Sequence, residues 1–362
     1  MGSAAADALA GRGARVLGLD RFPLPHAHGS SHGRSRVIRE AYFEHPLYVP
    51  LVRRAYELWH ELERDCGTAL LTRTGLVSLG PPGSDVVDGA RRSAREHGIA
   101  HENLSADAVR ARWPALQVRD GEEALYETRA GLLAVEECLR ALHARARRRG
   151  AELHAEEPVL EWRAAGDGVE VHTARATYAA GAAVVSAGSW AATLLPELAL
   201  PLQVERQVVH WFAPAPGSPP LTAERCPIVL WQHAPDGVFY TTPDTGHGLK
   251  GAQHHGGPLV SPDSVAPPGL EDEAASRALL ARLLPAAAGP LLDARTCLYT
   301  NAPDGHFVVD RHPRHPQVIV ASPCSGHGFK FATALGEVLA DLAAGRPSTF
   351  DLGPFSLSRL GG

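Results

Sequence analysis

Apolar residues recur at helical spacing in several parts of the chain. Between Tyr48 and Leu62 the spacing of three and four residues places one set of side chains on a single helix face, namely Leu51, Ala55, Leu58 and Leu62. Two further helices are predicted over 135–149 and 329–343. Ser105 is a suitable N-terminal cap for a shorter helix, which should end before Pro114 because proline disfavours helix in the residue before it.

Alternating or continuous apolar runs predict strands between these helices. The clearest runs cover 151–154, 159–162, 169–172, 182–186, 202–212 and 318–321. Strand-like alternation continues after the fifth run as far as Leu249. Because this block interrupts a pattern of strand, turn and helix, the middle of the chain predicts an antiparallel sheet inserted into an α/β domain.

The first twenty residues read as a helix, a glycine turn and a strand that ends at Asp20. This is the second half of a βαβ dinucleotide-binding unit, in which the acidic residue binds a ribose hydroxyl. The glycine fingerprint of such units requires an earlier strand, and only its last glycine, Gly2, is present. Four or five buried strand side chains contribute on the order of 10 kcal/mol, which rivals a domain's stability. We therefore expect Met1 to be an internal methionine of a longer natural chain, truncated at its N-terminus.

Composition limits the classes of partner. With 362 residues and 44% hydrophobic content, the chain is expected to form two domains around large cores. A net charge of -5 argues against nucleic acid, which requires a dense basic face. Five cysteines without a framework spacing indicate a reducing, cytoplasmic location. No signal segment and no apolar run long enough for a membrane span is found, so we expect a small-molecule partner and no membrane contact.

Three stretches carry residues suited to chemistry. The first is His32-Gly-Arg-Ser-Arg36-Val-Ile-Arg39, and the second, Gly248-Leu-Lys250-Gly-Ala-Gln-His254, lies on a predicted strand. The third combines Cys297-Leu-Tyr299-Thr-Asn-Ala-Pro-Asp304 with Ser325-Gly-His327-Gly-Phe-Lys330, whose glycines let backbone N–H groups approach a ligand. Taken alone, paired arginines are more often structural than ligand-binding.

These stretches, together with the Asp20 strand and the turn Ser186-Ala-Gly-Ser-Trp190, resemble the monomeric sarcosine oxidase and N-methyltryptophan oxidase family of flavoenzymes. The resemblance covers nearly the whole chain in the same order. It implies an α/β fold with an FAD-binding Rossmann-like domain and a mixed, β-rich antiparallel substrate domain. We expect the FAD domain to comprise 1–80, 135–200 and 298–362, and the substrate domain to comprise 81–134 and 201–297.

The resemblance implies FAD as the cofactor, attached covalently through the sulfur of Cys297. Cys324, which stands where the family has an apolar residue, is expected to pack near the flavin. The family also has an Asp-Thr pair where this chain has Arg34-Ser35. The residues that match the family's cofactor contacts are Gly2, Asp20, His32, Ser35, Arg36, Gly188, Trp190, Cys297, Gly326, His327, Gly328 and Lys330.

The resemblance further implies how substrate is held and oxidised. Arg39 and Lys330 match the two cations that bind the substrate carboxylate. Tyr240, Tyr299 and His254 match residues that line the substrate pocket. The residues expected to act in catalysis are Lys250, which matches the lysine of the oxygen reaction, His254 and Arg36. Glu44 is expected to pair with one of the arginines.

The implied activity is oxidation of a secondary amino acid, such as sarcosine or N-methyltryptophan, with O2 as acceptor and H2O2 as product. Two alternatives remain at this stage: an oxidase of a bulkier secondary amine of the fructosyl amino acid or pipecolate type, and an inactive truncated flavin-fold protein. We expect a monomer. Histidines are numerous, but no Asp, Glu or Cys partners stand at ligand spacing, so no metal site is predicted.

Overall fold

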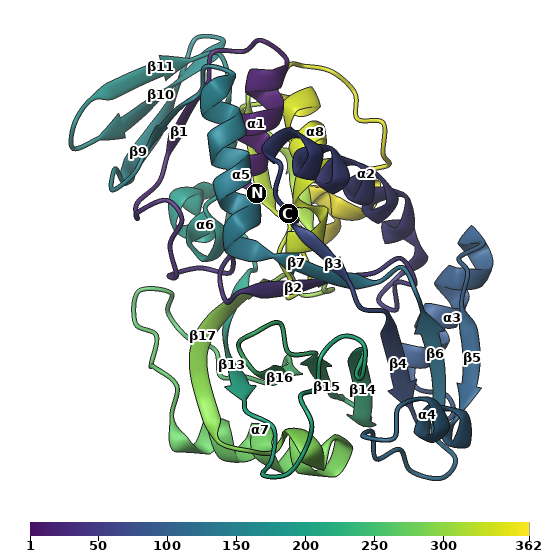
Figure 1. Ribbon diagram of the computed structural model, residues 1–362. Helices are drawn as coiled ribbons and strands as arrows, with labels where there is room; N and C mark the ends of the chain where they lie inside the picture. The colour runs from purple at the N-terminus through teal and green to yellow at the C-terminus, as the bar shows by residue number, and fades with distance from the viewer. Residues whose placement is uncertain (362) are drawn as a thin grey trace.

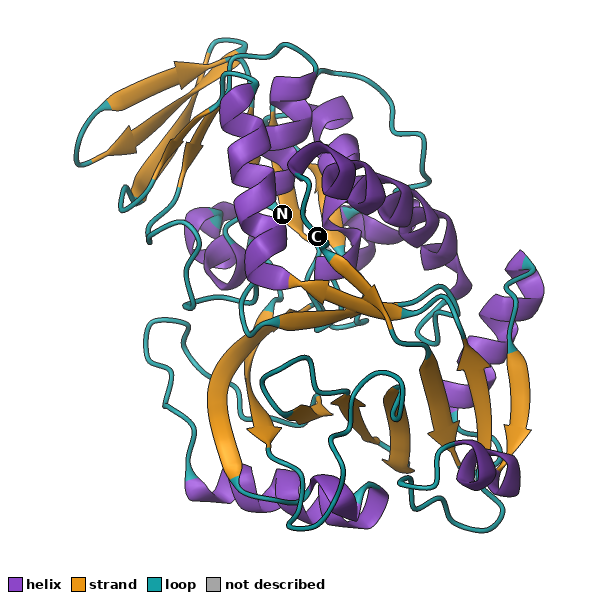
Figure 2. Ribbon diagram, in the orientation of Figure 1, coloured by secondary structure: helices purple, strands orange, loops and turns teal. Residues whose placement is uncertain are grey.

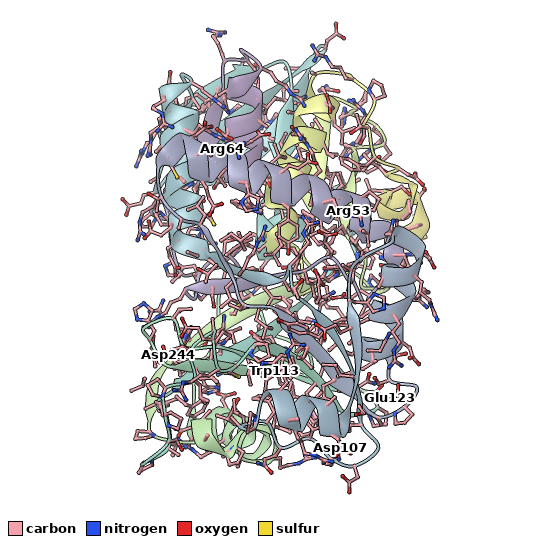
Figure 3. All side chains as sticks on the ribbon, turned by 45° about the vertical axis from the view of Figure 1, so that its right-hand side comes forward. Arg53, Arg64, Asp107, Trp113, Glu123 and Asp244 are labelled. Carbon is pink, nitrogen blue, oxygen red and sulfur yellow. The ribbon has the colours of Figure 1, made fainter. Side chains whose placement is uncertain are left out.

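The computed structural model describes residues 1–361 and divides into an upper helical half and a lower half built on a large sheet (Figure 1). In Figure 3, Arg53 and Arg64 mark a helix of the upper half, whereas Trp113 and Asp244 mark the lower half. The long helices of the upper half are α1 (Gly2–Gly11), α2 (Val49–Cys66), α5 (Val135–Arg148) and α8 (Ala332–Ala343).

Two groups of strands pack against these helices, and each group contains one parallel pair. Strand β1 (Leu17–Leu19) pairs in parallel with β8 (Glu152–His154). Strand β12 (Ala183–Val185) pairs in parallel with β19 (Val318–Ser322), which pairs antiparallel with β18 (Val308–Arg311). Helix α1 contacts both β1 and β12, but no strand within residues 1–361 is hydrogen-bonded to both of them. The helix, turn and strand predicted for the first twenty residues are confirmed.

The lower half is organised by an eight-stranded sheet of order β17-β13-β16-β15-β14-β4-β6-β5 (Figure 2). All neighbours are antiparallel except β14 and β4, which pair in parallel. The mixed, β-rich half agrees with the fold class implied by the resemblance. The strands are β4 (Leu76–Gly80), β5 (Glu102–Ser105), β6 (Glu123–Glu127), β13 (Gln203–Phe212), β14 (Ile228–Ala234), β15 (Gly237–Thr242), β16 (Leu249–His254) and β17 (Leu291–Asn301).

A small sheet lies between the two halves, with β2 (Ser35–Ile38) and β3 (Leu71–Arg73) on either side of β7 (Gly131–Ala134) (Figure 1). A separate three-stranded meander consists of β9 (Val159–Ala165), β10 (Gly168–Thr173) and β11 (Thr177–Ala180). The remaining α-helices are α3 (Asp85–His97), α4 (Ala106–Arg112), α6 (Ala191–Leu194) and α7 (Leu270–Leu283). Within residues 1–361, no helix is both long and apolar enough to cross a membrane.

Local sequence signals account for most of these elements. The predicted face of α2 is buried, and the Ser105 hydroxyl accepts a hydrogen bond from the Ala108 N–H at the start of α4. Helix α7 was not predicted, because its apolar residues do not gather on one face and most of its side chains remain at least partly exposed. The parallel pairing of β4 with β14 was also not predicted, since the two strands lie far apart in sequence.

The proposed division into two domains stays a prediction. The eight-stranded sheet includes β4, which belongs to the first proposed FAD segment, and β17 crosses the proposed boundary at residue 297. The sheet is therefore built from chain segments on both sides of the proposed boundaries.

Helices α1 and α8 approach each other closely at a glycine. A Cβ on Gly336 of α8 would lie 2.6 Å from the carbonyl oxygen of Ala4. Helix α1 is also fixed to α5 by a buried ion pair, in which Arg145 donates to both oxygens of Asp7 at 2.6 to 3.1 Å. The short first helix is therefore held by two neighbours at once.

We expect Gly336→Ala to lower the free energy of unfolding by about 1 to 3 kcal/mol, the usual cost of overpacking. The added methyl group must push α1 away from α8, since the contact is with backbone. Gly181→Ala is the control, because a Cβ there meets no atom within 4 Å. Denaturant unfolding of both holoproteins measures the difference, and equal stabilities would contradict the close contact.

Candidate active site

A cavity lies where the small middle sheet, the eight-stranded sheet and the turn before α8 meet. Its walls come from chain segments that are distant in sequence. They include the loop and strand around β2, strands β13 to β17, and the Ser-Gly-His-Gly turn. Many of the predicted site residues line it, namely Ser35, Arg36, Arg39, Gly188, Tyr240, Lys250, His254, Cys297, Tyr299, Gly326, His327, Gly328 and Lys330.

One side of the cavity brings Arg36 against the thiol of Cys297. Arg36 is fixed by hydrogen bonds of 2.9 Å to the carbonyl oxygens of Ser35 and Ser30, and its Nη2 lies 3.3 Å from the Cys297 sulfur. Cys297 is 4% exposed and sits on β17 opposite Gln207. The buried thiol therefore has a cation as its direct neighbour in the cavity wall.

Lys250 lies beside this pair on β16. Its Nζ donates to the carbonyl oxygen of Ser35 at 3.0 Å and lies 5.4 Å from the centre of the Trp211 ring. Burial, followed by the charge of Arg36, holds the pKa of Lys250 well below its usual range. The Lys250 ammonium is thus held by the backbone of β2. The residue is buried, lies near the ring of Trp211 and lines the cavity.

The loop before β2 is held by Glu136, which sequence reasoning missed. Its carboxylate accepts hydrogen bonds from the N–H groups of Gly33 and Arg34 at 3.0 and 3.1 Å. Arg34 has a φ of 66°, a left-handed conformation that a side chain disfavours. The only sequence signal was an acidic residue in the first turn of α5, which is common in helices without any such role.

A second buried carboxylate, Glu127, holds the chain just after Arg39. It accepts from the N–H groups of Glu40 and Ala41 at 2.7 and 2.9 Å and is fully buried at the end of β6. Burial raises the pKa of Glu127 despite these hydrogen bonds. Sequence reasoning gave no sign of this contact, because the partners are 87 and 86 residues apart.

Arg39 is buried and already paired with a carboxylate. It donates to both oxygens of Glu44 at 2.7 and 2.8 Å, which confirms the expectation that Glu44 pairs with an arginine. Its guanidinium carbon lies 4.2 Å from the Tyr42 ring centre and 4.6 Å from that of Phe43. Burial alone would raise the pKa of Glu44, but Arg39 and other nearby cations lower it to about 2.

Lys330 faces the same region from the turn before α8. It donates to the carbonyl oxygen of His327 at 2.7 Å and to the hydroxyl of Tyr42 at 3.2 Å. The His327 Nε2 lies 3.1 Å from the Gly305 carbonyl oxygen, which can only accept, so Nδ1 accepts from the Tyr42 hydroxyl at 2.7 Å. Burial and the charge of Arg39 lower the pKa of Lys330 to about 7.

His254 and Tyr299 form the opposite wall. His254 Nδ1 and the Tyr299 hydroxyl lie 3.2 Å apart, and burial holds the pKa of His254 well below its usual range. Gly326 has a φ of 77°, and a Cβ there would lie 2.7 Å from the Tyr299 ring, so the turn requires glycine. Tyr240 lines the cavity nearby, and burial raises its pKa to about 12.

Four predicted cofactor residues, Gly2, Asp20, His32 and Trp190, do not line this cavity. Asp20 accepts from the Phe22 N–H, and Trp190 donates to Asp263. A Cβ on Gly2 would lie 2.7 Å from the Ser186 hydroxyl, whose residue does line the cavity. Both ring nitrogens of His32 are buried without a hydrogen-bond partner within residues 1–361.

The residues present fit a dinucleotide flavin. The cavity extends from Met1, Ser186 and Gly188, near the end of β12, to Cys297 and its neighbouring cations. Gly188 has a φ of 55°, and a Cβ on it would meet no atom, so its backbone is open to a ligand. The thiol of Cys297, which lines the cavity, supplies a group that a bound flavin can engage. Within residues 1–361, no group of three or more His, Cys, Asp or Glu is arranged to hold a metal ion.

We expect carboxylate binding to weaken as pH rises through about 7, where Lys330 loses its charge. Burial lowers the pKa of both His254 and His327 below the ordinary value of a histidine, so both rings stay neutral above pH 6. Titration of the holoenzyme's flavin absorbance with propionate should show a dissociation constant that is flat below this pH and rises by up to about tenfold per unit above it.

Lys330→Met is the matched variant for this titration. It should bind propionate weakly at every pH, with no slope between pH 6 and 9, because Arg39 keeps its charge throughout that range. A slope of the same size in the variant would show that another group titrates.

Comparisons with known proteins identify the family and the fold. The profile of the family described as FAD dependent oxidoreductase matches residues 1–342. The chain is 44% identical to the monomeric sarcosine oxidase of Streptomyces avermitilis, over 99% of this chain and 95% of that protein. It is 38% identical to the N-methyl-L-tryptophan oxidase of Salmonella typhimurium, over 96% and 93% of the two chains. The crystal structure of L-proline dehydrogenase from P. horikoshii has the same fold, with a TM-score of 0.86, 19% identity and coverage of 99% and 94%.

Proposed function

The chain belongs to the FAD-dependent oxidoreductases, in the family of monomeric sarcosine oxidases and N-methyltryptophan oxidases, and on this premise we propose that it oxidises a secondary amino acid with O2. The products are the corresponding imine, which water hydrolyses, and H2O2. FAD, when bound, accepts two electrons from the C–H bond next to the substrate nitrogen and passes them to oxygen. The enzyme is thus an oxidoreductase of CH–NH donors.

The observation that carries the proposal is that two kinds of groups, two cationic and two neutral, line one cavity. Arg39 and Lys330 form a cationic end suited to a carboxylate, since a guanidinium fork and an ammonium both donate to its oxygens. His254 and Tyr299 form a neutral end. An amino acid held by its carboxylate therefore places its amine beside a neutral imidazole, which can accept the amine's N–H.

Glu44 must give up part of its contact when substrate binds. In the structure, both oxygens of Glu44 accept hydrogen bonds from Nη2 of Arg39. Glu44 stays negatively charged at neutral pH because its pKa is about 2. The substrate carboxylate competes with it for Arg39, while Lys330 supplies a second donor. The dry surroundings of both cations strengthen the contact with a carboxylate relative to water.

Lys250 supports the choice of oxygen as acceptor. Oxygen reduction passes through an anion, which a fixed positive charge near the reacting centre stabilises. Lys250 is anchored to Ser35, next to Arg36 and Cys297, and away from Arg39. We therefore propose that Lys250 serves the oxygen reaction and not substrate binding, which separates an oxidase from a dehydrogenase of the same fold.

Cys297 is proposed as the point of covalent FAD attachment. Its sulfur is buried, its residue lines the cavity, and it lies 3.3 Å from the Arg36 guanidinium.

The direct test of the function is peroxide release by the holoenzyme with sarcosine, N-methyl-L-tryptophan and pipecolate. We expect turnover with at least one secondary amino acid, and at least about a hundredfold loss of kcat/KM in Arg39→Met, because a buried charge-assisted contact is lost. Glycine and alanine, which are primary amino acids, are the matched control substrates. Faster oxidation of these primary amines would overturn the proposal.

Cys297→Ala should release its flavin on acid precipitation, whereas the yellow colour should stay with the precipitated wild type. The reason is that only a covalent bond survives unfolding. Cys324→Ala is the control thiol, since Cys324 lines the same cavity but is not next to Arg36. Flavin in the supernatant of wild type would rule out covalent attachment.

Lys250→Met should slow reoxidation of the reduced enzyme by oxygen about 10² to 10³-fold, the usual effect of removing one stabilising donor. Anaerobic reduction by substrate should change only a few-fold, because Lys250 does not contact the carboxylate end. Stopped-flow absorbance separates the two half-reactions. Equal slowing of both would show that Lys250 positions the flavin and does not act on oxygen.

A further inference from the structure

The ring of Phe43 lies between the two ends of the substrate cavity. The Arg39 guanidinium carbon is 4.6 Å from its centre, and the His254 ring centre is 6.5 Å away with the two rings at 86°. Arg39 belongs to the carboxylate end and His254 to the amine end. Because one carbon atom joins these two groups in an α-amino acid, Phe43 faces that carbon.

The space behind Phe43 is filled by protein. The ring packs against one buried hydrophobic cluster, as do Val37 and Tyr240, and all three side chains line the cavity. The cluster joins the middle sheet to the eight-stranded sheet and is formed by Leu76, Val86, Ala130, Leu132, Ile228 and Leu230. A substituent that points from the α-carbon toward Phe43 therefore meets a close-packed wall.

The backbone that carries Phe43 is fixed against α3. A Cβ on Gly89 would lie 2.2 Å from the Phe43 carbonyl oxygen, so the helix touches this carbonyl. The Ser93 hydroxyl donates to the Tyr42 carbonyl oxygen at 2.5 Å. Arg39 and Glu44, which flank this segment in the sequence, form an ion pair with each other. The backbone of Tyr42 and Phe43 is thus held against α3, and these contacts keep the ring in the cavity wall.

We propose that Phe43 limits the size of the substituent on the substrate's α-carbon, so that the enzyme acts on N-substituted glycines in preference to N-methyl amino acids with a large side chain. The inference rests on the proposed function and narrows its substrate class. It places no limit on the N-substituent, because the ring faces the carbon between the carboxylate and amine ends.

The experiment compares sarcosine with N-methyl-L-phenylalanine, using peroxide release by the wild-type holoenzyme and by Phe43→Ala. Wild type should favour sarcosine in kcat/KM by more than about 100-fold, and the variant should raise kcat/KM for the aromatic substrate at least about tenfold. The quantity that decides is the ratio of the two kcat/KM values, because Phe43 also lies against Arg39 and its removal affects turnover of both substrates. A gain of activity is not an effect that general destabilisation produces.

Two further variants keep the test decisive. Phe43→Leu removes less volume, so it should give an intermediate ratio and covers the case in which the alanine variant folds poorly. Val238→Ala is the control, since Val238 packs on the same cluster but does not line the cavity, and its ratio should match wild type.

Two results would overturn the inference while leaving the function intact: equal turnover of both substrates by wild type, or an unchanged ratio in flavin-loaded Phe43 variants. Absence of peroxide with every secondary amino acid, in wild type and variants alike, would overturn the proposed function and the inference with it.

Discussion

Four cations share one dry cavity, and the need to hold them apart constrains the rest of the site. Arg36 and Lys250 are anchored by backbone carbonyl oxygens at one end, while Arg39 and Lys330 lie at the other. Buried charges repel strongly at low dielectric unless each has its own partners. Arg36 on strand β2 and Arg39, the residue directly after the strand, lie three residues apart; Arg36 contacts Cys297 and Arg39 pairs with Glu44.

The position of β2 depends in turn on two carboxylates from other elements. Glu136 holds the N–H groups just before the strand, and Glu127 holds those just after it. Each accepts from two successive backbone donors, which fixes direction as well as distance. The short strand is therefore clamped at both ends. A displacement of Glu136 would shift Arg36, and a displacement of Glu127 would shift Arg39. Because Glu136 belongs to helix α5, the helical half of the molecule is connected in this way to the cavity.

The sequence predicted many of the elements and the residues with distinctive chemistry, but not helices α3 and α7, and not the carboxylates that hold β2. Helix α2 and the cap at Ser105 follow from local spacing, and Cys297 with Tyr299 stands in a specific motif. Glu127 has no such signal, because its role arises from a contact with a segment 87 residues away. Likewise, β4 pairs with β14 only once the fold exists. Long-range pairing leaves no periodicity in either partner.

Phe43 shows why substrate size could not be read from the sequence. A phenylalanine three residues before Pro46, which begins a short 3-10 turn, is an ordinary core residue by its local pattern. It becomes part of the cavity wall because Arg39 and Glu44 pair across it and because Gly89 lets α3 approach its backbone. The contacts that hold Arg39, the proposed carboxylate-binding residue, therefore also place the ring of Phe43. In our proposal, binding of the carboxylate and selection for size both depend on this one short segment.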